Sequence, residues 1–176
     1  MGRNIEIKAK IHDWQKQLAL ADSLKTEPIA ELHQHDTFYI VPSGRLKLRV
    51  FPNNIGELIQ YYRDDVSDAK RSNYTIFRTD DPETLHRTLA DSIGVRGQVI
   101  KSRALVMIDQ TRVHFDRVEG LGEFMELEVV LHDDQSDSEG TTIADALIEA
   151  LEVRPQDLLE CAYIDLLENA SSSNAT

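Results

Sequence analysis

The chain has only one cysteine among its 176 residues, Cys161, which excludes a framework of intramolecular disulfides. It also lacks any apolar run of about 18 residues, the length that a membrane-spanning helix requires. Residues 1–6 lack the apolar segment of a secretory signal peptide. We therefore expect a cytoplasmic protein that makes no contact with a membrane.

Linkers rich in proline or glycine are absent too, and the sequence shows no internal repeat. Because domains commonly span about 100–200 residues, this favours a single domain, predicted over residues 1–169. Residues 170–176 have the polar sequence ASSSNAT and are predicted to form a disordered tail.

Basic residues are scarce, since 19 Lys and Arg against 31 Asp and Glu give a formal net charge of −12. An overall field of this sign does not attract nucleic acid, so we expect no nucleic-acid partner. An anionic ligand would have to be held by a local cluster of Lys and Arg. The sequence contains no P-loop, zinc-ligand spacing or serine-hydrolase motif, which disfavours those enzyme classes.

Alternation of apolar and polar residues predicts strands at 3–11, 30–41, 45–51, 56–64, 70–79, 97–109, 111–118 and 123–132. Helical periodicity predicts helices after Asp13, from Pro82, around 143–151 and around 159–166, with an acidic loop at 133–140. Long strands joined by short turns favour an antiparallel sheet, and closure would hide its edges. The predicted fold class is α+β, an eight-stranded antiparallel closed β-barrel with helices packed on the outside.

Charged residues gather on one face of each predicted strand. The sets are Glu6, Lys8 and Lys10; Arg45, Lys47 and Arg49; Lys101 and Arg103; Arg112, His114 and Asp116; and Glu126 and Glu128. One interpretation is that each charged face meets water, as in any half-buried sheet. In the other, helices cover the apolar faces and the charged faces line the barrel interior. The sorting of basic and acidic sets onto different strands favours the second interpretation.

An interior with basic and acidic walls suits a polyphosphate. Lys and Arg neutralise phosphate oxygens, whereas carboxylates in the same cavity repel them unless a hard cation lies between. The predicted cofactor is therefore Mg²⁺ or Mn²⁺. His33 and His35 could also form a metal pair, but we expect them to be exposed strand residues.

Six segments in order then carry a family resemblance: residues 4–8 (NIEIK), 36–39 (DTFY), 44–49 (GRLKLR), 58–63 (LIQYYR), 101–103 (KSR) and 114–128 (HFDRVEGLGEFMELE). Together they resemble the CYTH domain family, also called triphosphate tunnel metalloenzymes. The resemblance covers residues 3–169 and implies an eight-stranded antiparallel tunnel with helices outside.

The resemblance also implies roles for individual residues. The triphosphate-binding residues would be Lys8, Lys10, Arg45, Lys47, Arg49, Arg63, Lys101 and Arg103. The metal ligands would be Glu6, Glu126 and Glu128, and the candidate catalytic residues are Asp116 and His114. Asn4 departs from the family pattern, because it replaces the first glutamate of the E-x-E-x-K signature and brings no charge to a metal.

Three functions remain open at this stage. The block at 114–128 favours a class IV adenylyl cyclase-like enzyme, which converts ATP to cyclic AMP and pyrophosphate. The first alternative is a triphosphatase that hydrolyses inorganic tripolyphosphate, thiamine triphosphate or a nucleoside triphosphate. The second is a non-catalytic polyphosphate- or nucleotide-binding module, which Asn4 keeps open. In each case the partner is a small-molecule triphosphate, and the oligomeric state, monomer or homodimer, is left open.

Overall fold

The computed structural model describes residues 3–63 and 70–173, with the side chains of residues 63, 70–73 and 171–173 excepted. Its main feature is a nine-stranded antiparallel sheet. The strands are β1 Arg3–Lys10, β2 Ala30–Tyr39, β3 Arg45–Val50, β4 Gly56–Arg63, β5 Lys70–Thr79, β6 Val95–Ile108, β7 Thr111–Val118, β8 Gly122–Val130 and β9 Leu158–Leu159. The predicted α+β class with a large antiparallel sheet is confirmed, and all eight predicted strands are present.

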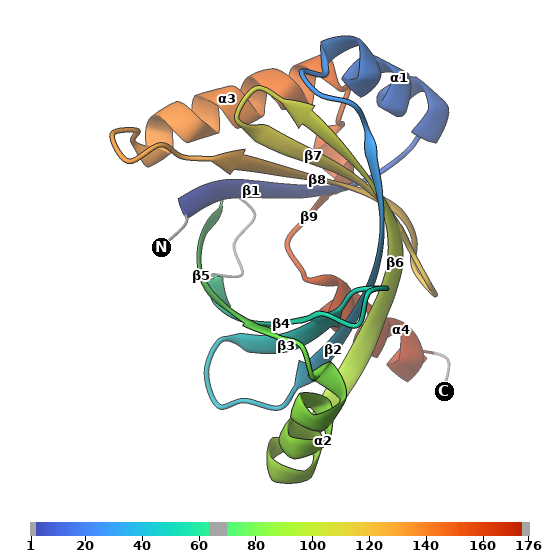
Figure 1. The fold of residues 1–176 in the computed structure, drawn as a ribbon. Coiled ribbons are helices and arrows are strands. Elements are labelled where there is room, and N and C mark those ends of the chain that lie inside the picture. Colours follow the sequence, from blue (N-terminus) through green and yellow to red (C-terminus); the bar gives the residue numbers. More distant parts are fainter. Residues whose placement is uncertain (1–2, 64–69, 174–176) are drawn as a thin grey trace.

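The strands follow the spatial order β5-β4-β3-β2-β6-β7-β8-β1-β9, and they curve around a common centre in Figure 1. Strand β1 pairs with β8 along its length and with β9 at Lys8 and Ala9. It also pairs with β5, from Arg3 opposite Asn73 to Glu6 opposite Lys70. Strands β5 and β1, which lie far apart in this order, are therefore also paired with each other.

Four α-helices accompany this sheet within the described residues: α1 Trp14–Leu24, α2 Pro82–Ile93, α3 Asp137–Ala150 and α4 Tyr163–Ser173. Asp13 caps α1 by accepting a hydrogen bond from the backbone N–H of Lys16, and Asp81 caps α2 in the same way through Thr84. A short 3₁₀-helix, Pro155–Asp157, precedes β9. None of the helices in the described ranges is both long and apolar enough to cross a bilayer.

Two predicted boundaries were wrong, for local reasons. The acidic segment expected as a loop at 133–140 already contains the first turn of α3, because Ser136 and Glu139 form a capping box there. Leu159 was expected in a helix but belongs to β9, so α4 begins only at Tyr163. Helix α4 ends at Ser173.

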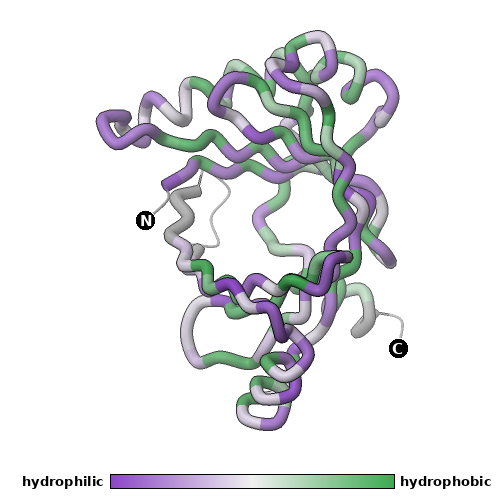
Figure 2. Tube along the Cα trace, viewed as in Figure 1, coloured by the Kyte–Doolittle hydropathy of each residue, from purple (hydrophilic) through white to green (hydrophobic). Residues whose placement is uncertain are grey.

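The apolar faces of the strands pack beneath helices. Val106, Phe115 and Leu127 form a core with the apolar sides of α1 and α3. Phe38, Val99 and Phe124 form a second cluster with the first turn of α4, but on the same strand faces as the charged residues. Figure 2 shows hydrophobic and hydrophilic segments alternating along the strands. The faces opposite the first core, which carry the charged residues, therefore turn toward the centre of the sheet's curve.

Candidate active site

A cavity of about 310 Å³ is lined by the inward faces of β1 to β8 and by the start of α4. Six basic and five acidic side chains reach it, together with His114 and Tyr163. The basic ones are Lys8, Lys47, Arg49, Lys101, Arg103 and Arg112, and the acidic ones are Glu6, Asp36, Glu57, Glu126 and Glu128. The charged strand faces thus converge on one cavity.

Asp36 organises one basic pair of this cavity. Its carboxylate accepts hydrogen bonds from Lys47 Nζ at 2.7 Å and from Arg49 Nε and Nη2 at 2.7 and 2.8 Å. The register explains the contact, since Asp36 lies opposite Arg49 in the β2–β3 pair. Burial alone would raise the pKa of Asp36, but Lys47 and Arg49 outweigh it and hold the pKa well below its usual value.

Asp116 organises a second basic pair deeper in the wall. Its two oxygens accept from Lys101 Nζ at 2.9 Å, from Arg103 Nε and Nη2 at 2.6 Å each, and from the Tyr163 hydroxyl at 3.0 Å. Burial would raise the pKa of Asp116, but the neighbouring Lys101 and Arg103 lower it strongly. Burial and Arg103 in turn lower the pKa of Lys101 to about 8. Both basic pairs are therefore held in fixed positions by buried carboxylates.

Acidic residues form the opposing part of the wall. Single ligand atoms of His114, Glu126 and Glu128 all lie within 4.8 Å of one another. The register brings them together, because Glu126 lies opposite both Lys8 and His114, and Glu128 lies opposite Arg112. Glu126 contacts Lys8 Nζ at 3.3 Å and Glu128 accepts from Arg112 Nε at 2.8 Å. One nitrogen and two carboxylates are a donor set that suits a divalent cation.

The unsatisfied Nδ1 of His114 supports a cation at this cluster. The side-chain oxygen of Asn4 and Nδ1 of His114 are buried without a hydrogen-bond partner, and the two residues are only 5% and 4% exposed. Burial, reinforced by Arg103, lowers the pKa of His114, which favours the neutral imidazole that a metal requires. The lone pair of the neutral His114 ring is available to an ion bound between Glu126 and Glu128.

A second, larger cavity of about 650 Å³ lies on the other face of the β2–β6–β7 wall. Its lining includes His33 and His35, which alternate with the inward Gln34 and are exposed, as the sequence predicted. Its Arg117 is paired with Glu123 at 3.0 Å. Because this cavity has no comparable group of basic residues, the 310 Å³ cavity is the candidate active site.

A model of the CYTH domain matches residues 2–163, which is most of the sequence. The chain belongs to the CYTH domain family. No curated protein matches the chain.

Solved structures share the fold of this CYTH domain at low sequence identity. The PH1012 protein of Pyrococcus horikoshii is 23% identical, with a TM-score of 0.81 over 93% of this chain and 99% of that one. A putative adenylate cyclase of Vibrio parahaemolyticus is 16% identical, with a TM-score of 0.74 over 94% and 97%. The putative adenylyl cyclase HpAC1 of Hippeastrum, described as having a dominant triphosphatase activity, is 13% identical, with a TM-score of 0.65 over 96% of both chains. At these identities the likeness establishes the fold alone.

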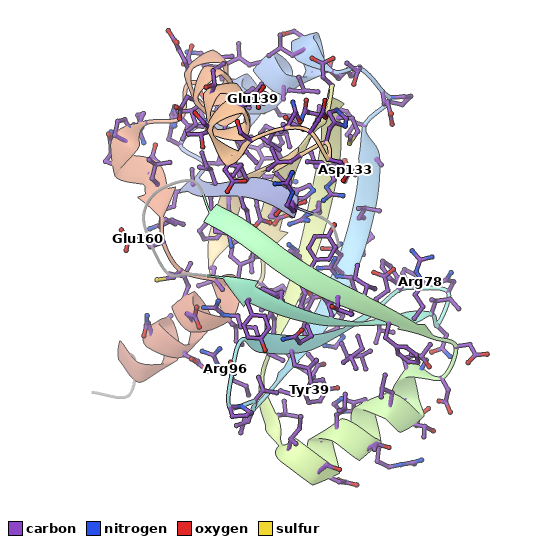
Figure 3. The ribbon with its side chains drawn as sticks, turned by 90° about the vertical axis from the view of Figure 1, so that its left-hand side faces the viewer. Tyr39, Arg78, Arg96, Asp133, Glu139 and Glu160 are labelled. Atoms are coloured by element: carbon purple, nitrogen blue, oxygen red, sulfur yellow. The ribbon has the colours of Figure 1, made fainter. Side chains whose placement is uncertain are left out.

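The CYTH fold brings together most of the residues singled out from the sequence. Those that line the cavity are Glu6, Lys8, Lys47, Arg49, Lys101, Arg103, His114, Glu126 and Glu128, and Asp116 lies directly behind Lys101 and Arg103. Two lie elsewhere. Arg45 donates to Asp165 of α4 at 2.9 Å, beside Arg96 (Figure 3), and Lys10 is exposed at the end of β1. The side chain of Arg63 lies outside the described residues.

Sequence reasoning gave no role to three residues of this site. Asp36 sits on the inward face of β2 and holds two basic residues. Its place two residues after Gln34 on an alternating strand was a usable signal. Arg112 was noted in its strand but not assigned to the ligand. Tyr163 reaches the cavity from α4, and no local sequence pattern predicts that a helix residue will contact the inward face of a sheet.

Proposed function

We propose that this CYTH domain is a divalent-metal-dependent enzyme that binds a triphosphate in the 310 Å³ cavity, with the sheet closed around the ligand as a tunnel. The observation that carries the proposal is the meeting of two fixed basic pairs with the cluster of His114, Glu126 and Glu128 in one buried volume. The pairing of β1 with β5 supports the closed form, because it joins the two sides of the curved sheet.

The basic pairs act on the phosphates. Arg49 and Arg103 present planar guanidinium groups that bind two oxygens at once, while Lys47 and Lys101 act as compact charges. Asp36 and Asp116 already hold these groups in position, so little side-chain freedom is lost when the ligand binds. A divalent ion between Glu126 and Glu128 would offset charge on the reacting phosphate.

The reaction that we propose first is cyclisation of ATP, since the block at 114–128 resembles the class IV adenylyl cyclase branch. Hydrolysis is the second candidate, because the phosphate clamp and the metal serve both reactions equally. A binding module without turnover is the third, and Asn4 is the observation in its favour: its neutral oxygen lies where the family signature has a carboxylate.

A product assay separates these outcomes. The protein is incubated with ATP, tripolyphosphate or thiamine triphosphate and with Mg²⁺ or Mn²⁺, and the products are resolved by chromatography. Cyclic AMP with pyrophosphate supports the cyclase and free phosphate the triphosphatase. Tight calorimetric binding without turnover supports the module.

A variant pair tests the cavity itself. Arg49→Ala should abolish binding or turnover, because it leaves phosphate charge uncompensated in a buried site. Arg87→Ala, on the exposed side of α2, is the matched control and should change neither. Equal behaviour of the two variants would place the ligand elsewhere.

A further inference from the structure

The wall of the cavity formed by β4 and β5 is mostly apolar and aromatic. Its cavity-lining residues are Glu57, Ile59 and Tyr61 on β4 and Tyr74 and Ile76 on β5. The register places Tyr61 directly opposite Tyr74, and Ile59 directly opposite Ile76. Ile59, Tyr61, Tyr74 and Ile76 therefore form one apolar, aromatic patch of the cavity lining, here called the aromatic wall.

The aromatic wall has no use toward a bare polyphosphate. Tripolyphosphate offers only anionic oxygens, and placing these against apolar side chains forfeits hydration without a compensating contact. Most other cavity-lining positions of the sheet are charged or polar, as with Lys101 and Arg103 on β6, and the apolar exceptions are Leu32, Phe38 and Val99. An aromatic pair in the same cavity is the surface that a planar organic ring packs against.

The phosphate-binding residues and the aromatic wall come together at Lys47. Its Nζ lies 5.7 Å from the centroid of the Phe38 ring and 5.9 Å from that of Tyr61, while it donates to Asp36 at 2.7 Å. Phosphate bound at Lys47 and Arg49 would thus lie next to the aromatic wall. A ligand with an anionic chain and a ring attached to it matches this order of surfaces.

Gln34 adds an independent observation. It lines the same cavity, is 5% exposed, and its Oε1 is buried without a hydrogen-bond partner. A carbonyl oxygen only accepts hydrogen bonds, and so do the oxygens of a deprotonated polyphosphate, so the two cannot satisfy each other. An organic group that carries an N–H or O–H can.

We propose that the site takes an organic triphosphate, in which a planar ring lies against Tyr61 and Tyr74, in preference to inorganic tripolyphosphate. This rests on the proposed function, because it names the substrate class of the same cavity. The shared chemistry of a nucleoside triphosphate and thiamine triphosphate fits, namely a triphosphate joined to a heteroaromatic ring with hydrogen-bond donors.

Calorimetry tests the preference directly. Dissociation constants are measured with Mg²⁺ for a non-hydrolysable ATP analogue, for thiamine triphosphate and for tripolyphosphate. At least one ring-bearing ligand should bind tenfold or more tightly than tripolyphosphate, and the comparison of the two identifies which ring is accepted. Equal or tighter binding of tripolyphosphate would overturn the proposal.

Variants locate the ring. Tyr61→Ala and Tyr74→Ala should each weaken the ring-bearing ligand by tenfold or more and change tripolyphosphate by less than threefold. Tyr62→Ala is the matched control, because Tyr62 is the next residue on β4, faces outward and is 51% exposed; it should change neither ligand. Tyr61→Leu keeps apolar volume without the ring, so it gives the same readout if Tyr61→Ala does not fold.

The outcomes also separate this inference from the proposed function. If both ligand types bind, Arg49→Ala abolishes both and the tyrosine variants leave both unchanged, the triphosphate site stands and the aromatic wall is not part of it. If neither ligand type binds the wild-type protein, the proposed function fails and this inference fails with it.

Discussion

Asp116 shows at the scale of one residue how much of this site depends on buried charge. It is fully buried and accepts from Lys101, Arg103 and Tyr163. Asp116→Asn leaves two buried cations facing a neutral amide, so we expect a loss of about 3–5 kcal/mol in the free energy of unfolding. Urea denaturation measures it. Lys16→Gln, which removes an exposed ion pair with Glu152, should cost less than about 1 kcal/mol.

If Asp116→Asn and Lys16→Gln lowered the free energy of unfolding by similarly small amounts, the cations beside Asp116 would be free to move into water. The cavity wall would then not be held in position before the ligand binds.

Lys101 makes ligand affinity depend on pH. Its pKa is lowered to about 8 by burial and Arg103, against the opposing effect of Asp116 and Glu126. Above pH 8 the free protein loses this charge and must take up a proton to bind a triphosphate, so affinity should fall by up to about tenfold per pH unit. Lys101→Arg stays protonated and should flatten this fall. Calorimetric titration with tripolyphosphate from pH 7 to pH 9.5 compares the two.

The stability of the ligand-free protein should respond in the opposite direction. Between pH 8 and the ordinary pKa of 10.5, the unfolded chain binds more protons at Lys101 than the folded chain does. The contribution of this residue to the free energy of unfolding therefore rises with pH across that window.

The affinity prediction has its own contradicting outcome. A triphosphate affinity that does not change between pH 7 and pH 9.5 in the wild-type protein would show that Lys101 does not contact the ligand.

At the scale of elements, the capping box of α3 carries a stability prediction. Ser136 accepts from the backbone N–H of Glu139, and Glu139 accepts from the backbone N–H of Ser136. Glu139 is labelled at the start of the helix in Figure 3. Ser136→Ala should lower the free energy of unfolding by about 0.5–2 kcal/mol, because α3 packs on β1 and β8 and its first turn loses a cap.

Thermal or urea unfolding measures the change. The control is Ser138→Ala, because Ser138 is exposed in the first turn of the same helix. It should change the free energy of unfolding by less than about 0.5 kcal/mol. Equal effects of the two serine variants would assign the start of α3 to packing rather than to its cap.

The same elements show what the sequence could and could not predict. Alternation along β6 and β8 placed Lys101, Arg103 and Glu126 on inward faces, because a strand repeats every two residues whatever its partners. The start of α3 was hidden, since its acidic, serine-rich first turn has the composition of a loop. Strand β9 has two residues, too few for any periodicity. Contacts such as Tyr163 with Asp116 depend on packing between distant segments, which local patterns do not encode.

For the whole molecule, the central fact is that an acidic chain encloses a nearly balanced set of charges. The chain carries a net charge of −12, yet six basic and five acidic side chains line the cavity. In the free protein the basic ones are engaged by four carboxylates, those of Asp36, Asp116, Glu126 and Glu128. A triphosphate must therefore compete with internal carboxylates and approach the pair Glu126 and Glu128, which repels it.

A divalent ion removes that repulsion, so metal and triphosphate should bind cooperatively. We expect Mn²⁺ and a non-hydrolysable triphosphate together to raise Tm by more than the sum of their separate shifts. At a ligand concentration of about 100 times Kd the stabilisation is about 2.7 kcal/mol, or roughly 5–10 °C for a chain of this size.

Glu128→Gln should reduce the combined Tm shift to the sum of the separate shifts. Glu83→Gln, on the exposed face of α2, should leave the combined shift unchanged. Chelation with EDTA should return the wild-type protein to the shift of the triphosphate alone. Strictly additive shifts in the wild-type protein would mean that the ion and the phosphates do not share the cavity, since two ligands that relieve each other's repulsion must be coupled.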